Sequence, residues 1–227
     1  MEALAPHLEL EDLAAGQILY QPGVPIEFVY FPETAVASMI RRMADGAGVE
    51  VGTIGREGVV GGAVALGATV MPTECLLQVG GKVQRLPVPA LRDALANTST
   101  SDDGPSLLGL MLLYSQALFE QCAQTAACNR LHALEQRCAR WLLMIHDRVE
   151  GDELHLTQEF LSYMLGVRRA GVTEACGTLM RAGLIRYRHG HITIVDREGM
   201  EAATCECFQV SIDAYEQLLG ASLASCA

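Results

Sequence analysis

LTQEFLSYMLGVRRAGVTEACGTLMRAGLI, residues 156–185, is the stretch from which the fold of this chain can be worked out. Its first half has apolar residues at helical spacing behind Thr157, a suitable N-cap. Gly166 then interrupts the pattern. A second helical run follows, and Gly183 stands just past its end, where helices commonly have a glycine. The stretch therefore predicts a helix-turn-helix.

Arginine residues gather around this motif. Residues 166–191 contain five arginines and one acidic residue, a local charge of +4, whereas the whole chain carries −11 and the remainder therefore −15. In a helix-turn-helix the first residues of the second helix meet base edges in the major groove. Here they are Arg168 and Arg169, with Thr173 one turn further on. The pattern favours DNA binding through one basic face, and the alternative is a packed helix pair with no DNA role.

Two short apolar segments after the motif predict a wing. Residues 184–188 and 192–195 flank His189 and Gly190, a pair suited to a tight turn. A final helix is expected at 196–219, where apolar residues recur at helical spacing. The C-terminal domain, residues 133–227, is thus predicted to be a winged helix-turn-helix.

The first hundred residues have the pattern of an antiparallel β domain. Short runs such as 28–31 and 49–52 are separated by Gly and Pro, which predicts short strands and turns. The polar, turn-forming segment 97–105 then breaks the composition. Residues 1–103 are therefore predicted to form a β-roll of the jelly-roll type, and the whole chain is predicted to be α+β.

A long helix is expected between the two domains, over residues 104–132. Its residues at alternating spacings of four and three predict a coiled-coil seam for a partner helix. Apolar residues also lie off this seam, so one face can pack on the β domain while the other meets a partner. An ordinary buried helix remains the alternative. The predicted dimerisation residues are Leu107, Met111, Tyr114, Leu118, Gln121 and Thr125.

Composition indicates a globular protein of the cytoplasm. The chain has 227 residues, of which 50% are hydrophobic, enough for two modest cores. The beginning of the chain has no basic segment followed by an apolar core, so no secretory signal is expected. The longest weakly polar run, residues 59–71, has 13 residues against the roughly 20 that span a bilayer. The eight cysteines are scattered, which suits reduced, buried thiols.

The order of β-roll, long helix and winged helix-turn-helix resembles the Crp/Fnr family of bacterial transcription regulators. Two stretches carry the resemblance most specifically: ACNRLHALEQRCARWLLMIHDRV, residues 127–149, and LTQEFLSYMLGVRRAGVTEACGTLMRAGLIRYRHGHITIVD, residues 156–196. The resemblance implies a regulator rather than an enzyme, a homodimer on palindromic double-stranded DNA, and contact with RNA polymerase. It also implies an effector in the β-roll and a hinge at residues 128–132.

The resemblance also indicates which residues contact DNA. Arg169 matches the arginine that commonly contacts a base in the family, and it suits guanine by bidentate geometry. Two neighbouring family positions differ, because Ala170 and Glu174 stand where Glu and Arg are frequent. The predicted DNA contacts are Thr157, Gln158, Arg168, Arg169, Gly171, Thr173, Arg186 and Arg188.

The effector region departs from the cyclic-nucleotide binders of the family. Those proteins hold the cyclic phosphate with an Arg followed by Ser or Thr, but residues 71–74 here lack the Arg. A buried phosphate without a cationic partner is costly to desolvate, which argues against cyclic AMP. The effector is therefore unknown, and Arg56 with Glu57 could instead form a structural ion pair. The predicted pocket residues are Arg56, Glu57, Gly61, Gly62 and Thr73.

We expect no cofactor and no metal. An iron–sulfur cluster needs about four converging thiolates, and the β domain contains only Cys75. Cys205 and Cys207 are too close together for the usual zinc knuckle. A metal-dependent cupin-type enzyme is disfavoured because residues 8–131 contain no His. Two weaker hypotheses remain: a redox role for Cys122 or Cys128 near the hinge, and a helix-turn-helix that contacts a protein instead of DNA.

Overall fold

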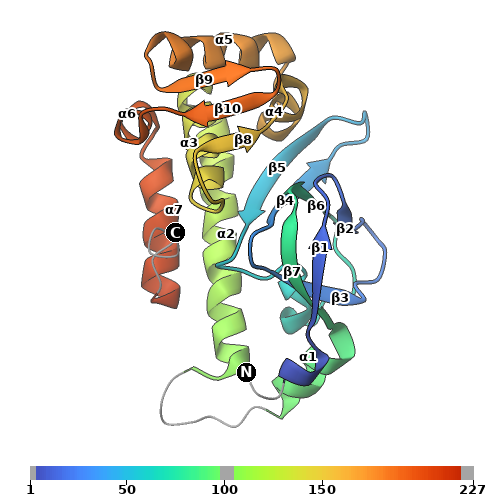
Figure 1. Cartoon of the computed structure of the whole chain (residues 1–227). Coiled ribbons are helices and arrows are strands. Elements are labelled where there is room, and N and C mark those ends of the chain that lie inside the picture. Colours follow the sequence, from blue (N-terminus) through green and yellow to red (C-terminus); the bar gives the residue numbers. More distant parts are fainter. Residues whose placement is uncertain (1–3, 98–104, 221–227) are drawn as a thin grey trace.

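The computed structural model describes residues 4–97 and 105–220. A β domain lies on one side of a long helix, α2 (Leu107–Leu131), and a helical domain caps one end of that helix (Figure 1). The C-terminal helix α7 (Cys207–Leu219) packs along α2. This arrangement confirms the predicted α+β class. Within the described residues, no helix combines the length and the apolar character that crossing a membrane requires.

The β domain consists of two antiparallel sheets, as predicted. One sheet has the order β1-β7-β3 and the other β2-β6-β4-β5, and every pairing between neighbouring strands is antiparallel. Two 3-10 turns and one helix complete the domain. Its elements are η1 (Ala5–His7), β1 (Glu9–Leu13), β2 (Ile18–Tyr20), β3 (Phe28–Pro32), β4 (Val36–Arg42), β5 (Gly48–Ile54), η2 (Gly62–Leu66), β6 (Glu74–Val79), β7 (Gly81–Pro87) and α1 (Val88–Ala96).

Helix α2 begins where the side chain of Ser106 accepts a hydrogen bond from the backbone of Gly109. It ends at Leu131, and α3 (Leu134–His146) starts after a short extended break at His132. This break lies at the end of the expected hinge, residues 128–132, of which 128–131 still belong to α2. The domain boundary proposed at residue 103 lies outside the described residues.

Most of the predicted dimerisation seam of α2 is buried within the chain, which corrects the expectation that this face is free for a partner. Met111, Tyr114 and Gln121 are at most 5% exposed, because β5, η2 and α7 cover this face of the helix. Thr125 is buried as well, and Leu107 and Leu118 are half-buried. Helical periodicity identified a real stripe, but the chain itself covers it. The opposite face is the exposed one.

The C-terminal domain has the predicted winged helix-turn-helix order. After α3 come β8 (Glu153–His155), α4 (Gln158–Leu165), α5 (Arg169–Arg181), β9 (Ile185–Arg188) and β10 (His191–Ile194), and the three strands pair in the order β8-β10-β9. The final helix differs from its prediction because it is broken. Residues 204–206 separate α6 (Arg197–Ala203) from α7.

The core of this domain continues into the β domain. Trp141 of α3 is 2% exposed and belongs to a cluster that also contains Val36 and Ile40 of β4. The indole Nε1 of Trp141 donates a hydrogen bond to Glu50 Oε1 of β5 at 2.8 Å. The position of the helix-turn-helix is therefore set by packing against the β-roll.

Candidate DNA-binding surface and effector pocket

Local geometry fixes the helix-turn-helix. Thr157 caps α4 by accepting a hydrogen bond from the backbone of Phe160 at 3.1 Å, as its residue type predicts. Gly166 ends α4 with φ of 64°, a left-handed conformation that costs glycine little. Across the turn, the hydroxyl of Thr173 lies 2.9 Å from Gln158 Oε1 and joins the two helices. Three of the predicted DNA-contact positions are thus brought together.

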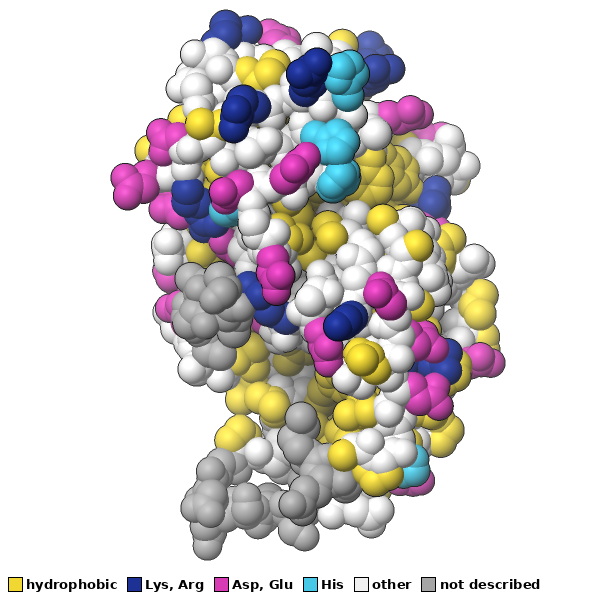
Figure 2. Space-filling view, in the orientation of Figure 1, with side chains coloured by type: hydrophobic (Ala, Val, Ile, Leu, Met, Phe, Trp, Pro, Cys, Tyr) yellow, Lys and Arg dark blue, Asp and Glu magenta, His cyan; other side chains and the backbone are white. Residues whose placement is uncertain are grey.

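Four of the predicted DNA-contact arginines are exposed at one end of the molecule. In the described part of the chain, no hydrogen bond or ion pair engages their side chains. Figure 2 shows Lys and Arg side chains gathered around α5 and the wing, whereas acidic side chains are frequent on the rest of that face. Such side chains are available for phosphate and base contacts. These exposed arginines are Arg168, Arg169, Arg186 and Arg188.

The wing positions two of these arginines. Strands β9 and β10 pair from Arg188 opposite His191 to Ile185 opposite Ile194. The turn between them uses His189 at φ 51° and Gly190 at φ 84°. Ile185 is buried by the alternation of the strand, which leaves Arg186 and Arg188 exposed.

Gly171, one of the predicted DNA contacts, has a packing role that the prediction did not include. A Cβ atom at Gly171 would lie 2.9 Å from Leu134 Cδ2 of α3. The glycine therefore allows α5 to approach α3 closely. The sequence did not show this packing role, because it does not say which helix lies against Gly171.

Arg56 and Glu57, two of the predicted pocket residues, are not among the residues that line the cavity between the β-roll and α2, which is a correction to the prediction. Glu57 forms a buried ion pair with Arg148, which follows the end of α3, with 2.8 Å between Oε1 and Nη2. Arg56 Nη2 donates a hydrogen bond to the backbone oxygen of Asp147 at 2.8 Å. The two side chains connect the β domain to the DNA-binding domain. The expected ion pair of Arg56 with Glu57 is not the one that forms, because Glu57 pairs with Arg148.

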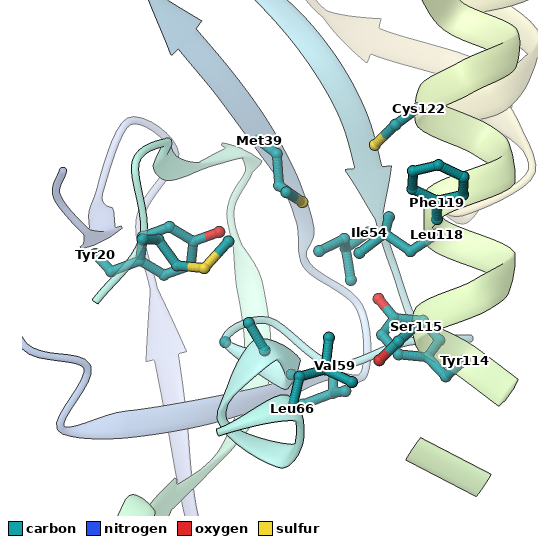
Figure 3. Close-up of a pocket in the computed structure, with 14 residues that line it drawn as sticks. Tyr20, Met39, Ile54, Val59, Leu66, Tyr114, Ser115, Leu118, Phe119 and Cys122 are labelled. Carbon is teal, nitrogen blue, oxygen red and sulfur yellow. The ribbon is translucent and has the colours of Figure 1, made fainter. Parts of the chain in front are cut away.

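A cavity of about 240 Å³ lies between the β-roll and α2. Predicted residues Gly61 and Gly62 line it, whereas Thr73 is buried but is not among the lining residues. Figure 3 shows side chains of α2 along one side and those of the β-roll opposite. The lining has no charged side chain. The residues are Tyr20, Met39, Ile54, Val59, Gly61, Gly62, Ala63, Leu66, Met71, Tyr114, Ser115, Leu118, Phe119 and Cys122.

The polar side-chain groups of the cavity lining are the hydroxyls of Tyr20, Tyr114 and Ser115 and the thiol of Cys122. Burial raises the pKa of Tyr20, so its hydroxyl stays protonated and can donate a hydrogen bond. No cation in the lining could offset a phosphate. Residues from α2 were missed in the sequence because their periodicity does not say which side chains border a cavity.

Glu50 is a buried carboxylate between the two domains. It accepts hydrogen bonds from Ser38, Thr53 and Trp141. Burial raises the pKa of Glu50, and these hydrogen bonds act in the opposite direction. Nothing in the sequence distinguished it from the other acidic residues.

Two further ligand-type residues lie beside Cys205 and Cys207, which the sequence argument from their spacing did not consider. Cys205 and Cys207 are separated by one residue. Their neighbours in space are Cys128, in the last turn of α2, and His132, just after the end of that helix. All four side chains converge. The seven cysteines among the described residues are free, as expected for reduced thiols.

Comparison with known proteins identifies the C-terminal domain. Residues 136–203 match the family model of the Crp-like helix-turn-helix domain. A comparison with curated protein sequences gives no match.

Solved structures show the same fold over most of the chain. A CRP-family transcriptional regulator from Thermus thermophilus, TTHB099, is 15% identical, with TM-score 0.67 over 94% of this chain and 98% of its own. A CRP/FNR-family regulator from the same organism, TTHA1359, is 19% identical (TM-score 0.66; 86% and 97%). The c-di-GMP-responsive global regulator CLP from Xanthomonas campestris is 16% identical (TM-score 0.65; 85% and 96%). These neighbours are regulators, not enzymes.

Proposed function

This chain carries a Crp-like helix-turn-helix domain on the fold of Crp/Fnr transcription regulators, and we propose that it is a sequence-specific, homodimeric DNA-binding regulator. It acts on palindromic double-stranded DNA in the cytoplasm and adjusts transcription through RNA polymerase. The observation that carries the proposal is the group of exposed arginines on α5 and the wing, whose side chains form no hydrogen bond or ion pair with another described residue.

The contacts follow from the geometry of the motif. Helix α5 enters the major groove with its N-terminal end, where Arg169 contacts a guanine edge. Arg168, Arg186 and Arg188 contact phosphates and fix the register. Thr157 and Gln158, at the start of α4, contact the phosphates of the same half-site. The acidic remainder of the chain limits binding at other surfaces.

A second copy of the chain covers the exposed face of α2. Leu112 is 44% and Phe119 65% exposed, and both lie on one stripe of the helix with Ala123 and Ala126. Exposed apolar stripes of this kind are typical of interaction surfaces. We define the exposed stripe as Leu108, Leu112, Phe119, Ala123 and Ala126.

The stripe and the cavity share Phe119, which lines the cavity and is largely exposed. A partner helix on the stripe would therefore lie beside a bound effector. An uncharged, mainly apolar molecule fits the lining better than cyclic AMP, because a buried phosphate would lack a cation. In this way the effector can bias how the dimer presents its two recognition helices.

Selection of bound duplexes from a random pool tests the proposal, with the oligomeric state followed by light scattering. Without added ligand, the purified protein should enrich a two-fold palindrome whose half-sites lie about one helical turn apart. Enrichment of no sequence by a well-folded dimer, both alone and with the apolar metabolite fraction of a cell extract, would contradict it.

The dimer interface has its own test. Leu112→Glu with Phe119→Glu should give a monomer, because two charges would be buried at the stripe. Leu110→Glu is the matched control, since this exposed leucine lies on the other side of the same helix. A dimer that persists in the double variant would place the interface elsewhere.

A protein-binding role for the helix-turn-helix is the alternative. Contacts with phosphates release counterions, so DNA binding must weaken steeply as salt rises. Binding to a protein partner that is insensitive to salt, together with no duplex binding, would favour the alternative.

A further inference from the structure

Four metal-ligand side chains converge where the hinge meets the segment between α6 and α7. Cys128 lies near the end of α2, His132 follows it, and Cys205 and Cys207 flank Glu206. Their ligand atoms all lie within 4.8 Å of one another. The three cysteines are at most 4% exposed, and together they form a small cluster of their own.

The distances match a single tetrahedral ion. Cys128 Sγ lies 3.5 Å from Cys205 Sγ, and Cys207 Sγ lies 3.4 Å from His132 Nδ1. Zinc bonds of about 2.3 Å to sulfur and about 2.0–2.1 Å to nitrogen place tetrahedral ligand atoms about 3.5–3.8 Å apart. These two pairs of ligand atoms are therefore already close to the spacing that zinc requires, and all four ligand atoms lie within 4.8 Å of one another.

The surroundings of the cluster support its ligands. His132 Nε2 lies 3.3 Å from Glu206 Oε2, so the carboxylate can orient the ring and leave Nδ1 facing the cysteines. Gln124 Nε2 donates a hydrogen bond to Cys207 Sγ at 2.9 Å, which stabilises a thiolate. Partners of this kind accompany the ligands of metal sites in general.

We propose that Cys128, His132, Cys205 and Cys207 bind one Zn²⁺ ion as a tetrahedral Cys₃His site. Three thiolates and one neutral imidazole give a closed coordination sphere, which is the composition of structural zinc sites. An iron–sulfur cluster suits this geometry less well, because its ligands bind different iron atoms and stand further apart. The inference does not depend on DNA binding.

The ion would connect two parts of the chain that are 77 residues apart. It joins the hinge after α2 to the start of α7, and α7 in turn covers Tyr114 and Gln121 of α2. Zinc binding would therefore hold α7 on α2 and fix the angle at which α3 leaves the hinge. Removal of the metal should loosen both.

Titration of the reduced, metal-stripped full-length protein with Co²⁺ tests the site. One Co²⁺ per chain should bind with the intense visible bands of a tetrahedral ion and thiolate-to-metal charge transfer, and Zn²⁺ should displace it. Cys207→Ser should lose the charge-transfer bands of this site. Cys122→Ser, on the same helix as Cys128, is the matched control and should keep them. A Cys226→Ser background excludes the cysteine that lies outside the described residues.

A second variant covers the case in which Cys207→Ser does not fold. Glu206 is exposed, so Glu206→Gln leaves the core intact, and it should weaken zinc affinity about 10- to 100-fold if it orients His132. Zinc should also raise the melting temperature of the wild type.

Three results would overturn the proposal. The first is a wild-type Co²⁺ spectrum without charge transfer, as expected if the exposed group of Glu153, His155 and His191 held the ion instead. The second is Co²⁺ binding that Cys207→Ser leaves unchanged. The third is iron with acid-labile sulfide in protein purified without oxygen, which would indicate a cluster.

Discussion

The arginines of this chain include an exposed group and a buried group, and the two groups have different partners. The first group is exposed on α5 and the wing, and its side chains form no hydrogen bond or ion pair in the described structure. The second group is at most 9% exposed, and each of its side chains is hydrogen-bonded within the chain. The exposed group is Arg168, Arg169, Arg186 and Arg188, and the buried group is Arg137, Arg140 and Arg148.

The difference shows that burial, and not residue type, decides whether an arginine is available to bind DNA or stabilises the fold. A buried guanidinium needs an ion pair or hydrogen bonds, because an uncompensated buried charge costs several kcal/mol. Arg148 is paired with Glu57, and Arg137 donates to the backbone oxygen of Leu165 at 2.6 Å. An exposed guanidinium remains hydrated and exchanges that water for phosphate or base at little cost.

The largest expected effect comes from breaking the buried pair. Arg148→Ala should lower the free energy of unfolding by about 3–5 kcal/mol, because Glu57 would remain buried without its cation. Chemical denaturation monitored by circular dichroism measures the free energy of unfolding of the variant and the wild type. Replacing the pair together, Arg148→Met with Glu57→Leu, should cost much less. A small loss in Arg148→Ala would show that water reaches the pair.

Truncating the wing arginines should leave stability almost unchanged and weaken DNA binding. Arg186→Ala with Arg188→Ala should change the free energy of unfolding by no more than about 0.5 kcal/mol for each substitution. The slope of log K against log salt should fall by about 1 for each lost phosphate contact. An unchanged slope would remove the wing from the DNA interface.

A smaller, pH-dependent effect is expected at Glu50. Burial raises its pKa in the folded protein, so the folded state holds the proton more tightly than the unfolded chain, where the pKa is about 4.3. The contribution of this group to stability is therefore fully present below that value and falls as pH rises toward the folded pKa. The fall is complete once the pH exceeds the pKa of Glu50 in the folded protein.

Glu50→Gln should abolish this fall, because an amide does not titrate but keeps an acceptor for Trp141. Unfolding experiments at several values from pH 4 to 8 give the comparison. If the variant and the wild type lose stability in parallel, Glu50 is not the group responsible.

The sequence predicts features whose cause is local. The cap at Thr157, the helix break at Gly166 and the exposed arginines follow from neighbouring residues, and the structure contains all of them. The covered face of α2 does not follow, since periodicity defines faces without saying what packs on them. The Cys₃His group does not follow either, because Cys128 and Cys205 meet only after α7 folds back on α2.

The most direct test of sequence recognition by α5 is a comparison of DNA affinities. The wild type and Arg169→Ala are each titrated with the selected palindrome and with a scrambled duplex at one salt concentration. Base readout by Arg169 predicts a loss of roughly 1–3 kcal/mol per half-site on the palindrome and a smaller loss on the scrambled duplex. Equal losses on both duplexes would make Arg169 a phosphate contact and would contradict sequence recognition by α5.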